Sequence, residues 1–207
     1  MYKLKVCGMK NPDNIQQLVK LNPDFIGFIF YKKSKRYIGD SLGISSLDIP
    51  ESIKKVAVFV NSSINEVKTI MIKHQLDFAQ LHGDESPEFC LELKKAGIKI
   101  TKAFLIDEDF DFSVLKQYDS ACDYFLFDTK TNLYGGSGKK FNWRILEKYD
   151  NQKPFFLSGG IDLEDVDEIK KIYNLNIYAI DINSKFEVKS GMKDIDKIEK
   201  FIKDLRM

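Results

Sequence analysis

Eight short apolar segments alternate with longer, more polar segments along the 207 residues of this chain. The apolar segments are rich in β-branched and aromatic residues, which is typical of buried strands. Strands that alternate with helices form a parallel sheet, because each parallel pair needs a long crossover connection. The predicted strands are residues 3–7, 24–30, 55–60, 77–81, 99–105, 123–127, 154–157 and 177–181.

The segments that follow these strands have the hydrophobic spacing of amphipathic surface helices. The second connection, around Ser41–Leu47, is too weak to predict more than a turn of helix. The other predicted helices are Asn11–Leu21, Ile64–His74, Ser86–Ala96, Ser113–Tyr118, Asn142–Tyr149, Leu163–Tyr173 and Asp194–Leu205.

Eight strand–helix units favour closure of the sheet, so the expected fold is α/β, a (β/α)8 TIM barrel. The chain is long enough for one core and short for two, which predicts a single domain over residues 1–207. The alternative is an open doubly wound sheet, but the sequence lacks a Gly-x-Gly-x-x-Gly turn after the first strand. In a barrel, the active site lies at the carboxyl ends of the strands.

Composition excludes several classes of partner. The 32 basic and 31 acidic residues nearly cancel, so no overall field attracts nucleic acid. No apolar run approaches the roughly 18 residues that a membrane helix needs. Cys7, Cys90 and Cys122 show no metal or redox spacing and are expected to be reduced thiols. We therefore expect a cytoplasmic protein that binds neither nucleic acid nor membrane.

Two reactive side chains lie at the ends of predicted strands: Cys7 is the last residue of the first strand, and Asp128 directly follows the sixth. Cys7 could be a buried small hydrophobe, and Asp128 could cap a loop. Their positions favour a site, where a thiol becomes a base if positive charge lowers its pKa and a carboxyl group donates a proton. The glycine-rich residues 135–138, just after Asp128, predict a flexible lid.

Candidate binding residues also follow strands. Arg36 is either a surface arginine among lysines or a planar fork for a carboxylate. His82 is as well explained by a structural hydrogen bond as by a role in the site. Gly159 and Gly160 form either a plain tight turn or an anion site at a helix start, where barrels commonly bind phosphate.

Six blocks of sequence resemble the phosphoribosylanthranilate isomerase family in order and spacing, and together they cover essentially the whole chain. The blocks are KVCG at 5–8, GFIF at 27–30 with SKRY at 34–37, VAVFVN at 56–61, QLHGDE at 80–85, FDT at 127–129 with GGSG at 135–138, and LSGG at 157–160. The resemblance implies an Amadori rearrangement of N-(5-phosphoribosyl)anthranilate in tryptophan biosynthesis, without metal or organic cofactor.

The resemblance also implies roles. Asp128 matches the acid that protonates the furanose ring oxygen, Cys7 the base that removes the proton from sugar carbon 2, and Arg36 the arginine beside the anthranilate carboxylate. The other implied substrate-binding residues, several of them around the phosphate, are His82, Gly159, Gly160, Asp181, Asn183 and Ser184.

One departure and three questions remain. Lys185 stands where the family usually has a glycine near the phosphate, so its effect on that loop is open. A related isomerase of histidine biosynthesis uses two aspartates on a twofold-repeated barrel, whereas this chain has Cys7 in the first position and no visible repeat. A noncatalytic barrel that binds phosphoribosyl ligands is the second alternative. The chain is expected to be a monomer or a homodimer.

Overall fold

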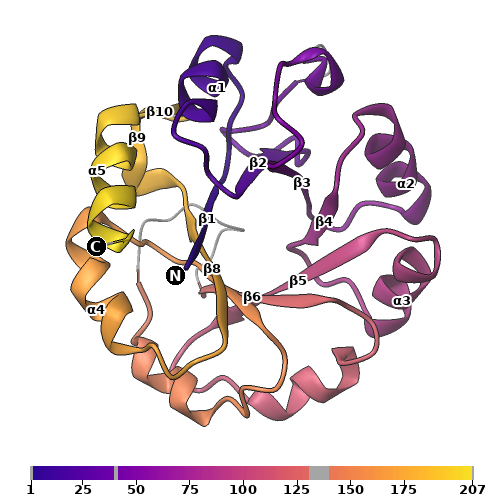
Figure 1. Cartoon of the computed structure of the whole chain (residues 1–207). Helices are drawn as coiled ribbons and strands as arrows, with labels where there is room; N and C mark the ends of the chain where they lie inside the picture. The colour runs from indigo at the N-terminus through magenta and orange to yellow at the C-terminus, as the bar shows by residue number, and fades with distance from the viewer. Residues whose placement is uncertain (1, 40–41, 131–139, 207) are drawn as a thin grey trace.

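The strands of the protein close into a barrel. The computed structural model describes residues 2–39, 42–130 and 140–206. Eight parallel strands pair in chain order and β8 returns to pair with β1, which confirms the predicted (β/α)8 barrel (Figure 1). The strands are β1 Lys3–Val6, β2 Phe25–Ile29, β3 Lys54–Phe59, β4 Phe78–Leu81, β5 Lys99–Ile106, β6 Tyr124–Thr129, β7 Phe155–Leu157 and β8 Ile177–Ile182.

The α-helices surround the barrel as an outer ring (Figure 1). Their starts follow local sequence signals, because the side chains of Asn11, Ser63 and Ser86 each accept a hydrogen bond from a backbone N–H of the first turn. The helices are α1 Pro12–Val19, α2 Ile64–Lys73, α3 Pro87–Lys95, α4 Val166–Lys171 and α5 Ile195–Arg206. None of the helices in the described ranges is long and apolar enough to cross a membrane.

Two predicted α-helices are wrong in type. The segments predicted as Ser113–Tyr118 and Asn142–Tyr149 form the 3₁₀ helices η2 Phe112–Tyr118 and η3 Trp143–Lys148. In η3 the backbone N–H of Tyr149 donates to the carbonyl of Leu146, three residues back. Over six or seven residues, apolar spacing does not distinguish a period of about 3.0 from one of about 3.6.

Two other connections also contain 3₁₀ turns. The segment predicted from Leu163 begins with the 3₁₀ turn η4 Leu163–Asp165 before α4. The weak second connection is the single turn η1 Ile44–Ser46.

A small hairpin after β8 was not predicted from the sequence. Following the 3₁₀ turn η5 Ser184–Phe186, strands β9 Glu187–Lys189 and β10 Met192–Lys193 pair antiparallel beside α1 and α5 (Figure 1). Asn14 of α1 holds the hairpin, because its side chain accepts from the N–H of Lys193 at 2.7 Å and donates to its carbonyl at 3.0 Å. These strands are too short and too charged to give a hydrophobic pattern.

The barrel interior changes from apolar to polar along its axis. A cluster of Phe25, Val56, Phe78, Ala103, Leu126, Phe156 and Ala179 fills one end, with several aromatic rings edge to face. Since side chains in a strand alternate between faces, the residue two positions further along also points inward. Those next residues, four of them within β3, β4, β6 and β8 and one directly after β7, line a cavity: Val58, Gln80, Asp128, Asp181 and Ser158.

Candidate active site

A cavity of about 750 Å³, including its open mouth, lies at the carboxyl ends of the strands. All nine residues singled out in the sequence line it, so the structure brings the candidate acid, base and binding groups to one place. They are Cys7, Arg36, His82, Asp128, Gly159, Gly160, Asp181, Asn183 and Ser184.

A buried chain of polar side chains forms the floor of the cavity. The ammonium of Lys5, a buried residue, lies 3.0 Å from Asp181 Oδ2 and donates to Gln80 Oε1 at 2.7 Å. Gln80 Nε2 lies 2.9 Å from His82 Nδ1. His82 Nε2 lies 3.3 Å from Asp128 Oδ2. The chain therefore connects β1, β4, β6 and β8.

This chain fixes the tautomer of His82. An ammonium only donates hydrogen bonds, so the carbonyl of Gln80 must face Lys5 and its NH₂ group must face His82. His82 Nδ1 then accepts a hydrogen bond, and a neutral ring carries its proton on Nε2. In the ligand-free protein His82 Nε2 lies 3.3 Å from Asp128 Oδ2 but is not aligned for a hydrogen bond with it.

Cys7 lies just beyond β1, where its N–H donates to the carbonyl of Ile182 at 2.9 Å. Gly27 of β2 packs against it, and a Cβ on Gly27 would come within 2.8 Å of the Cys7 sulfur. Burial raises the pKa of the Cys7 thiol, although the charges of Lys5 and Lys193 oppose this effect. The condition named for base action, a pKa lowered by nearby positive charge, is therefore not met in the ligand-free protein, because desolvation outweighs the nearby cations.

Asp128 lies inside β6, one residue beyond the predicted strand end, and its Oδ1 accepts from the N–H of Thr129 at 2.8 Å. Gly159 lies directly against this pair, since a Cβ there would be 3.2 Å from Asp128 Oδ1 and 2.8 Å from the Thr129 nitrogen. The close approach requires a glycine at this position. The glycine-rich residues 135–138, predicted as a lid, lie outside the described residues.

Arg36 is already paired. Its Nε and Nη2 donate to the carboxylate of Glu187 at distances of 2.6 to 3.0 Å. A Cβ on Gly8, whose φ is +77°, would come within 2.7 Å of Arg36 Cδ, so the arginine side chain lies across this glycine. Glu187 was not identified from the sequence.

The loop after β7 supplies backbone amides at positions where both glycines have left-handed φ angles, +98° for Gly159 and +63° for Gly160. The helical segment after this loop begins at Leu163, as predicted, with the 3₁₀ turn η4, so it starts three residues beyond Gly160. Two backbone N–H groups at its start already donate to side chains. The Leu163 N–H donates to the Asp162 carboxylate and the Asp162 N–H donates to the Asp165 carboxylate, each at 2.7 Å. Any anion bound here would be held by the glycine amides rather than by a helix terminus.

Lys185 does not enter the cavity. It sits exposed in η5, its carbonyl accepts from the ammonium of Lys197 at 2.8 Å, and it is not among the described residues with a positive φ. A glycine is therefore not required by the backbone at this position. We expect Lys185→Gly to leave the affinity for product and its salt dependence nearly unchanged in calorimetric titrations. A clear loss of affinity would place the lysine side chain on the phosphate.

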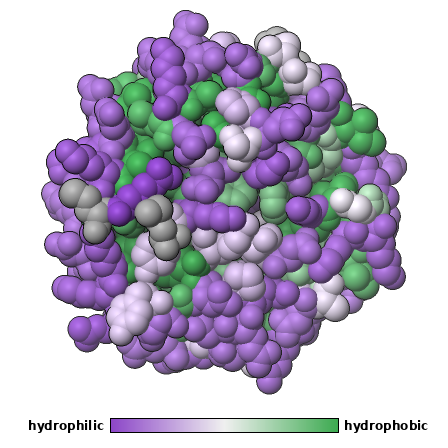
Figure 2. Space-filling view, in the orientation of Figure 1, coloured by the Kyte–Doolittle hydropathy of each residue, from purple (hydrophilic) through white to green (hydrophobic). Residues whose placement is uncertain are grey.

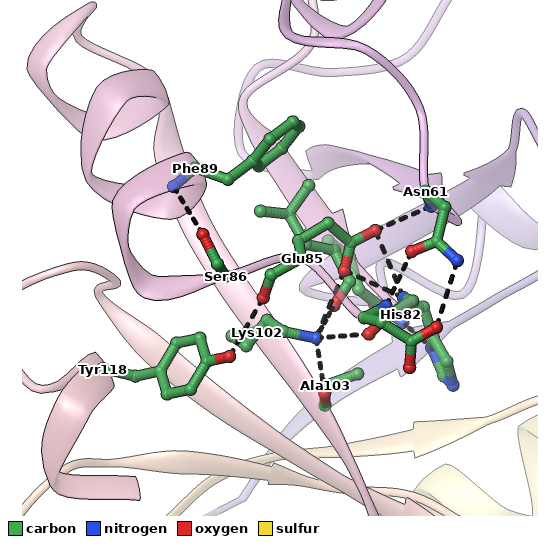
Figure 3. A network of polar contacts seen from close by, with 12 residues as sticks. Asn61, His82, Glu85, Ser86, Phe89, Lys102, Ala103 and Tyr118 are labelled. Atoms are coloured by element: carbon green, nitrogen blue, oxygen red, sulfur yellow. Dashed lines mark hydrogen bonds and ion pairs between the residues drawn. The ribbon is translucent and has the colours of Figure 1, made fainter.

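The loop that carries His82 is held by a second buried network (Figure 3). The Glu85 carboxylate accepts from the N–H groups of Gly83 and Asn61, each at 2.9 Å, and pairs with the Lys102 ammonium at 3.2 Å. Lys102 also donates to the carbonyl of Gly83 at 2.7 Å, and the Tyr118 hydroxyl donates to the carbonyl of Glu85. These contacts fix the backbone directly after His82.

Sequence reasoning missed the residues that support the site: Lys5, Gln80, Glu187 and Lys193. A signal existed for the first two, because each stands two positions before a candidate residue on the same strand and so shares its inward face. Glu187 lies two residues after Lys185 in the segment after the eighth strand that resembles the family, which was a signal for it, and Lys193 has no comparable signal. Within the described ranges no group of three or more His, Cys, Asp or Glu side chains could hold a metal ion.

A closed parallel barrel with a thiol and a carboxyl group in one cavity at its carboxyl end is a TIM-barrel enzyme suited to acid–base chemistry. Comparison with known families is more specific. Residues 4–204 match the family described as N-(5'phosphoribosyl)anthranilate (PRA) isomerase, and the chain belongs to that family.

Individual relatives agree with this assignment. The N-(5'-phosphoribosyl)anthranilate isomerase of Parabacteroides distasonis is 44% identical over 98% of this chain and 92% of its own length. The crystal structure of phosphoribosyl anthranilate isomerase from Thermotoga maritima has a TM-score of 0.89 at 34% identity, over 100% of this chain and 99% of that one. A complex of such an isomerase with reduced 1-(o-carboxyphenylamino)-1-deoxyribulose 5-phosphate has a TM-score of 0.86 at 30% identity, with the same coverage.

Proposed function

We propose that this protein converts N-(5-phosphoribosyl)anthranilate into 1-(2-carboxyphenylamino)-1-deoxyribulose 5-phosphate, the Amadori step of tryptophan biosynthesis. The observation that carries the proposal is the placement of Cys7 and Asp128 at one cavity on strands that lie three positions apart around the barrel. An aldose-to-ketose conversion needs a proton delivered to oxygen and another removed from carbon, which two such groups supply.

In the proposed first step, Asp128 gives its proton to the furanose ring oxygen. The bond between carbon 1 and that oxygen breaks while the amine nitrogen lone pair forms a C=N bond, giving a protonated Schiff base. In the second step, the Cys7 thiolate takes the proton from carbon 2, and the electrons of that C–H bond form a C=C bond to carbon 1 as nitrogen becomes neutral. The resulting enolamine tautomerises to the ketone product.

One neighbour supports the role of Cys7, and other groups of the cavity are assigned to the substrate. The charge of Lys5 favours the Cys7 thiolate, opposing the effect of burial. Asp181 Oδ1 is buried and has no hydrogen-bond partner among the described residues. Since a buried acceptor without a partner is costly, we assign it to a hydroxyl of the substrate sugar. The amides of Gly159 and Gly160, with Asn183 and Ser184, are assigned to the phosphate.

Arg36 is assigned to the anthranilate carboxylate, because a guanidinium can make paired, charge-assisted hydrogen bonds to it. Arg36→Lys keeps the charge but removes the fork. The affinity for a product analogue that bears the carboxylate should therefore fall about tenfold or more, as measured by calorimetry. Unchanged affinity would remove Arg36 from this role.

The function is tested by a turnover assay with freshly generated substrate, followed through loss of the anthranilate-derivative fluorescence. The proposal predicts complete conversion by catalytic amounts of protein. A noncatalytic binding barrel would bind the product analogue without consuming substrate. An isomerase of the histidine pathway would act on that pathway's substrate instead, although Cys7 stands where that enzyme uses an aspartate.

We also propose that the protein works in the cytoplasm as a monomer or a homodimer. The three cysteines are unpaired and buried, as expected in a reducing compartment. The face in Figure 2 is mainly hydrophilic, with hydrophobic residues in separate patches. The phosphoribosylanthranilate isomerase of Thermotoga maritima is described as dimeric. Sedimentation equilibrium distinguishes the two states.

A further inference from the structure

A buried ion cluster lies behind Arg36, outside the cavity lining. The Glu187 side chain is 4% exposed and accepts from Arg36 Nε at 2.8 and 3.0 Å and from Nη2 at 2.6 Å. The Lys193 side chain has no exposed surface, and its ammonium donates to Glu187 Oε1 at 2.8 Å. Neither residue is among those that line the cavity, whereas Arg36 is. Glu187 and Lys193 can therefore act on a ligand only through other residues.

The ion pair with Glu187 occupies one edge of the Arg36 guanidinium and leaves a second edge for another carboxylate. Glu187 occupies the edge formed by Nε and Nη2. A guanidinium has a second edge, between Nη1 and Nη2, whose N–H groups also match the two oxygens of a carboxylate. Because the group is planar and rigid, fixing the first edge fixes the direction of the second. Gly8 packs closely against the Arg36 side chain, because a Cβ on Gly8 would come within 2.7 Å of Arg36 Cδ.

Lys193 determines the net charge of the ion cluster. Arg36 and Glu187 alone would be neutral, and Lys193 restores a net positive charge while its ammonium is protonated. Burial lowers the pKa of Lys193 to about 8, although the charge of Glu187 opposes this effect, so the ammonium predominates at pH 7. Burial raises the pKa of Glu187, but Arg36 and Lys193 outweigh burial and hold that pKa below its usual value. The Lys193 ammonium has three acceptors, Glu187 Oε1, Asn183 Oδ1 at 2.7 Å and the Asn183 carbonyl at 3.1 Å, which match its three N–H donors.

We propose that Glu187 and Lys193 are positioning residues that make Arg36 selective for a substrate with an aromatic carboxylate. The inference rests on the proposed function, in which Arg36 binds that group. Glu187 sets the direction of the free guanidinium edge, and Lys193 prevents the charge of Glu187 from cancelling that of Arg36. The β9–β10 hairpin thus determines specificity from outside the cavity.

Glu187→Gln tests the proposal, because it removes the charge and keeps the size. Two ligands are titrated by calorimetry: reduced 1-(o-carboxyphenylamino)-1-deoxyribulose 5-phosphate and the same compound without the ring carboxylate. The affinity for the first should fall about tenfold or more, while the affinity for the second stays the same. In turnover, KM should rise more than kcat falls. Equal losses for both ligands, or no loss for either, would overturn the inference.

Matched variants separate positioning from simple damage. Glu147→Gln changes an exposed glutamate of η3 and should alter neither affinity. In an Arg36→Met background, Glu187→Gln should not change the preference between the two ligands any further. If Glu187→Gln does not fold, Glu187→Asp replaces it, because aspartate keeps the charge but is shorter by one methylene. This variant should also reduce the preference for the ligand that bears the ring carboxylate.

The outcome also separates this inference from the proposed function. A wild-type protein that neither converts the substrate nor prefers the carboxylate-bearing ligand contradicts both. A wild-type protein that does both, with a Glu187→Gln variant that keeps the full preference, contradicts the positioning role alone.

Discussion

Cys7→Ala is expected to lower turnover by about two to four orders of magnitude, because it removes the base that takes the proton from carbon 2. Binding of the product analogue should change little, since the groups assigned to its phosphate and carboxylate remain. Cys90→Ala is the matched control. It makes the same substitution at a buried cysteine of α3 that does not line the cavity, and should leave turnover nearly unchanged. Near-normal turnover by Cys7→Ala would exclude the thiol as the base.

The same assignment predicts a pH dependence. Burial raises the pKa of Cys7 above its ordinary value of 9.0, so the thiolate is a minor species at neutral pH. Its fraction in the ligand-free protein should grow only in the alkaline range, measured as thiolate absorbance in the difference between wild type and Cys7→Ala. A thiolate that is already formed at neutral pH would contradict a raised pKa for the base.

Lys5→Met is expected to destabilise the fold by about 3–5 kcal/mol, because it leaves the buried carboxylate of Asp181 without its partner. The pair is almost fully shielded, with side-chain exposures of 1% and 4%, and Gln80 loses its donor as well. Lys200→Met is the control: it breaks the exposed pair with Asp204 and should cost less than about 1 kcal/mol. Urea unfolding at neutral pH measures both.

Two further results would identify the cause of that loss. Removing the stranded charge with Lys5→Met/Asp181→Leu should recover part of the stability, since a buried pair replaced by apolar side chains is often tolerated. The single variant should be least destabilised at acid pH, where Asp181 is protonated and no buried charge remains. A loss equal to that of the exposed control would show that the pair contributes little.

The strand–helix alternation predicted the barrel because every strand has its own apolar run, which local sequence reveals. The helices after β5 and β6 were predicted in the wrong form, since a short apolar spacing fits α and 3₁₀ geometry alike. The β9–β10 hairpin gave no signal, because its stability comes from Asn14 and other distant partners rather than from a pattern of its own.

The candidate site was predictable because it follows from the positions of the strands. In a barrel, residues at strand ends converge, so position along the chain was enough to bring Cys7 and Asp128 to one cavity. The supporting contacts join residues far apart in sequence, with 151 positions between Arg36 and Glu187 and 75 between Lys5 and Gln80. The direction of the Cys7 pKa shift depends on burial, which only the folded structure shows.

The most direct test of the account is a crystal structure of this protein with reduced 1-(o-carboxyphenylamino)-1-deoxyribulose 5-phosphate. The phosphate should lie on the amides of Gly159 and Gly160 and the carboxylate on the free edge of Arg36. Cys7 Sγ should then lie within reach of carbon 2, and the Asp128 carboxyl group within hydrogen-bond distance of the oxygen that closed the furanose ring. A ligand bound in the opposite direction, or with carbon 2 out of reach of the thiol, would contradict it.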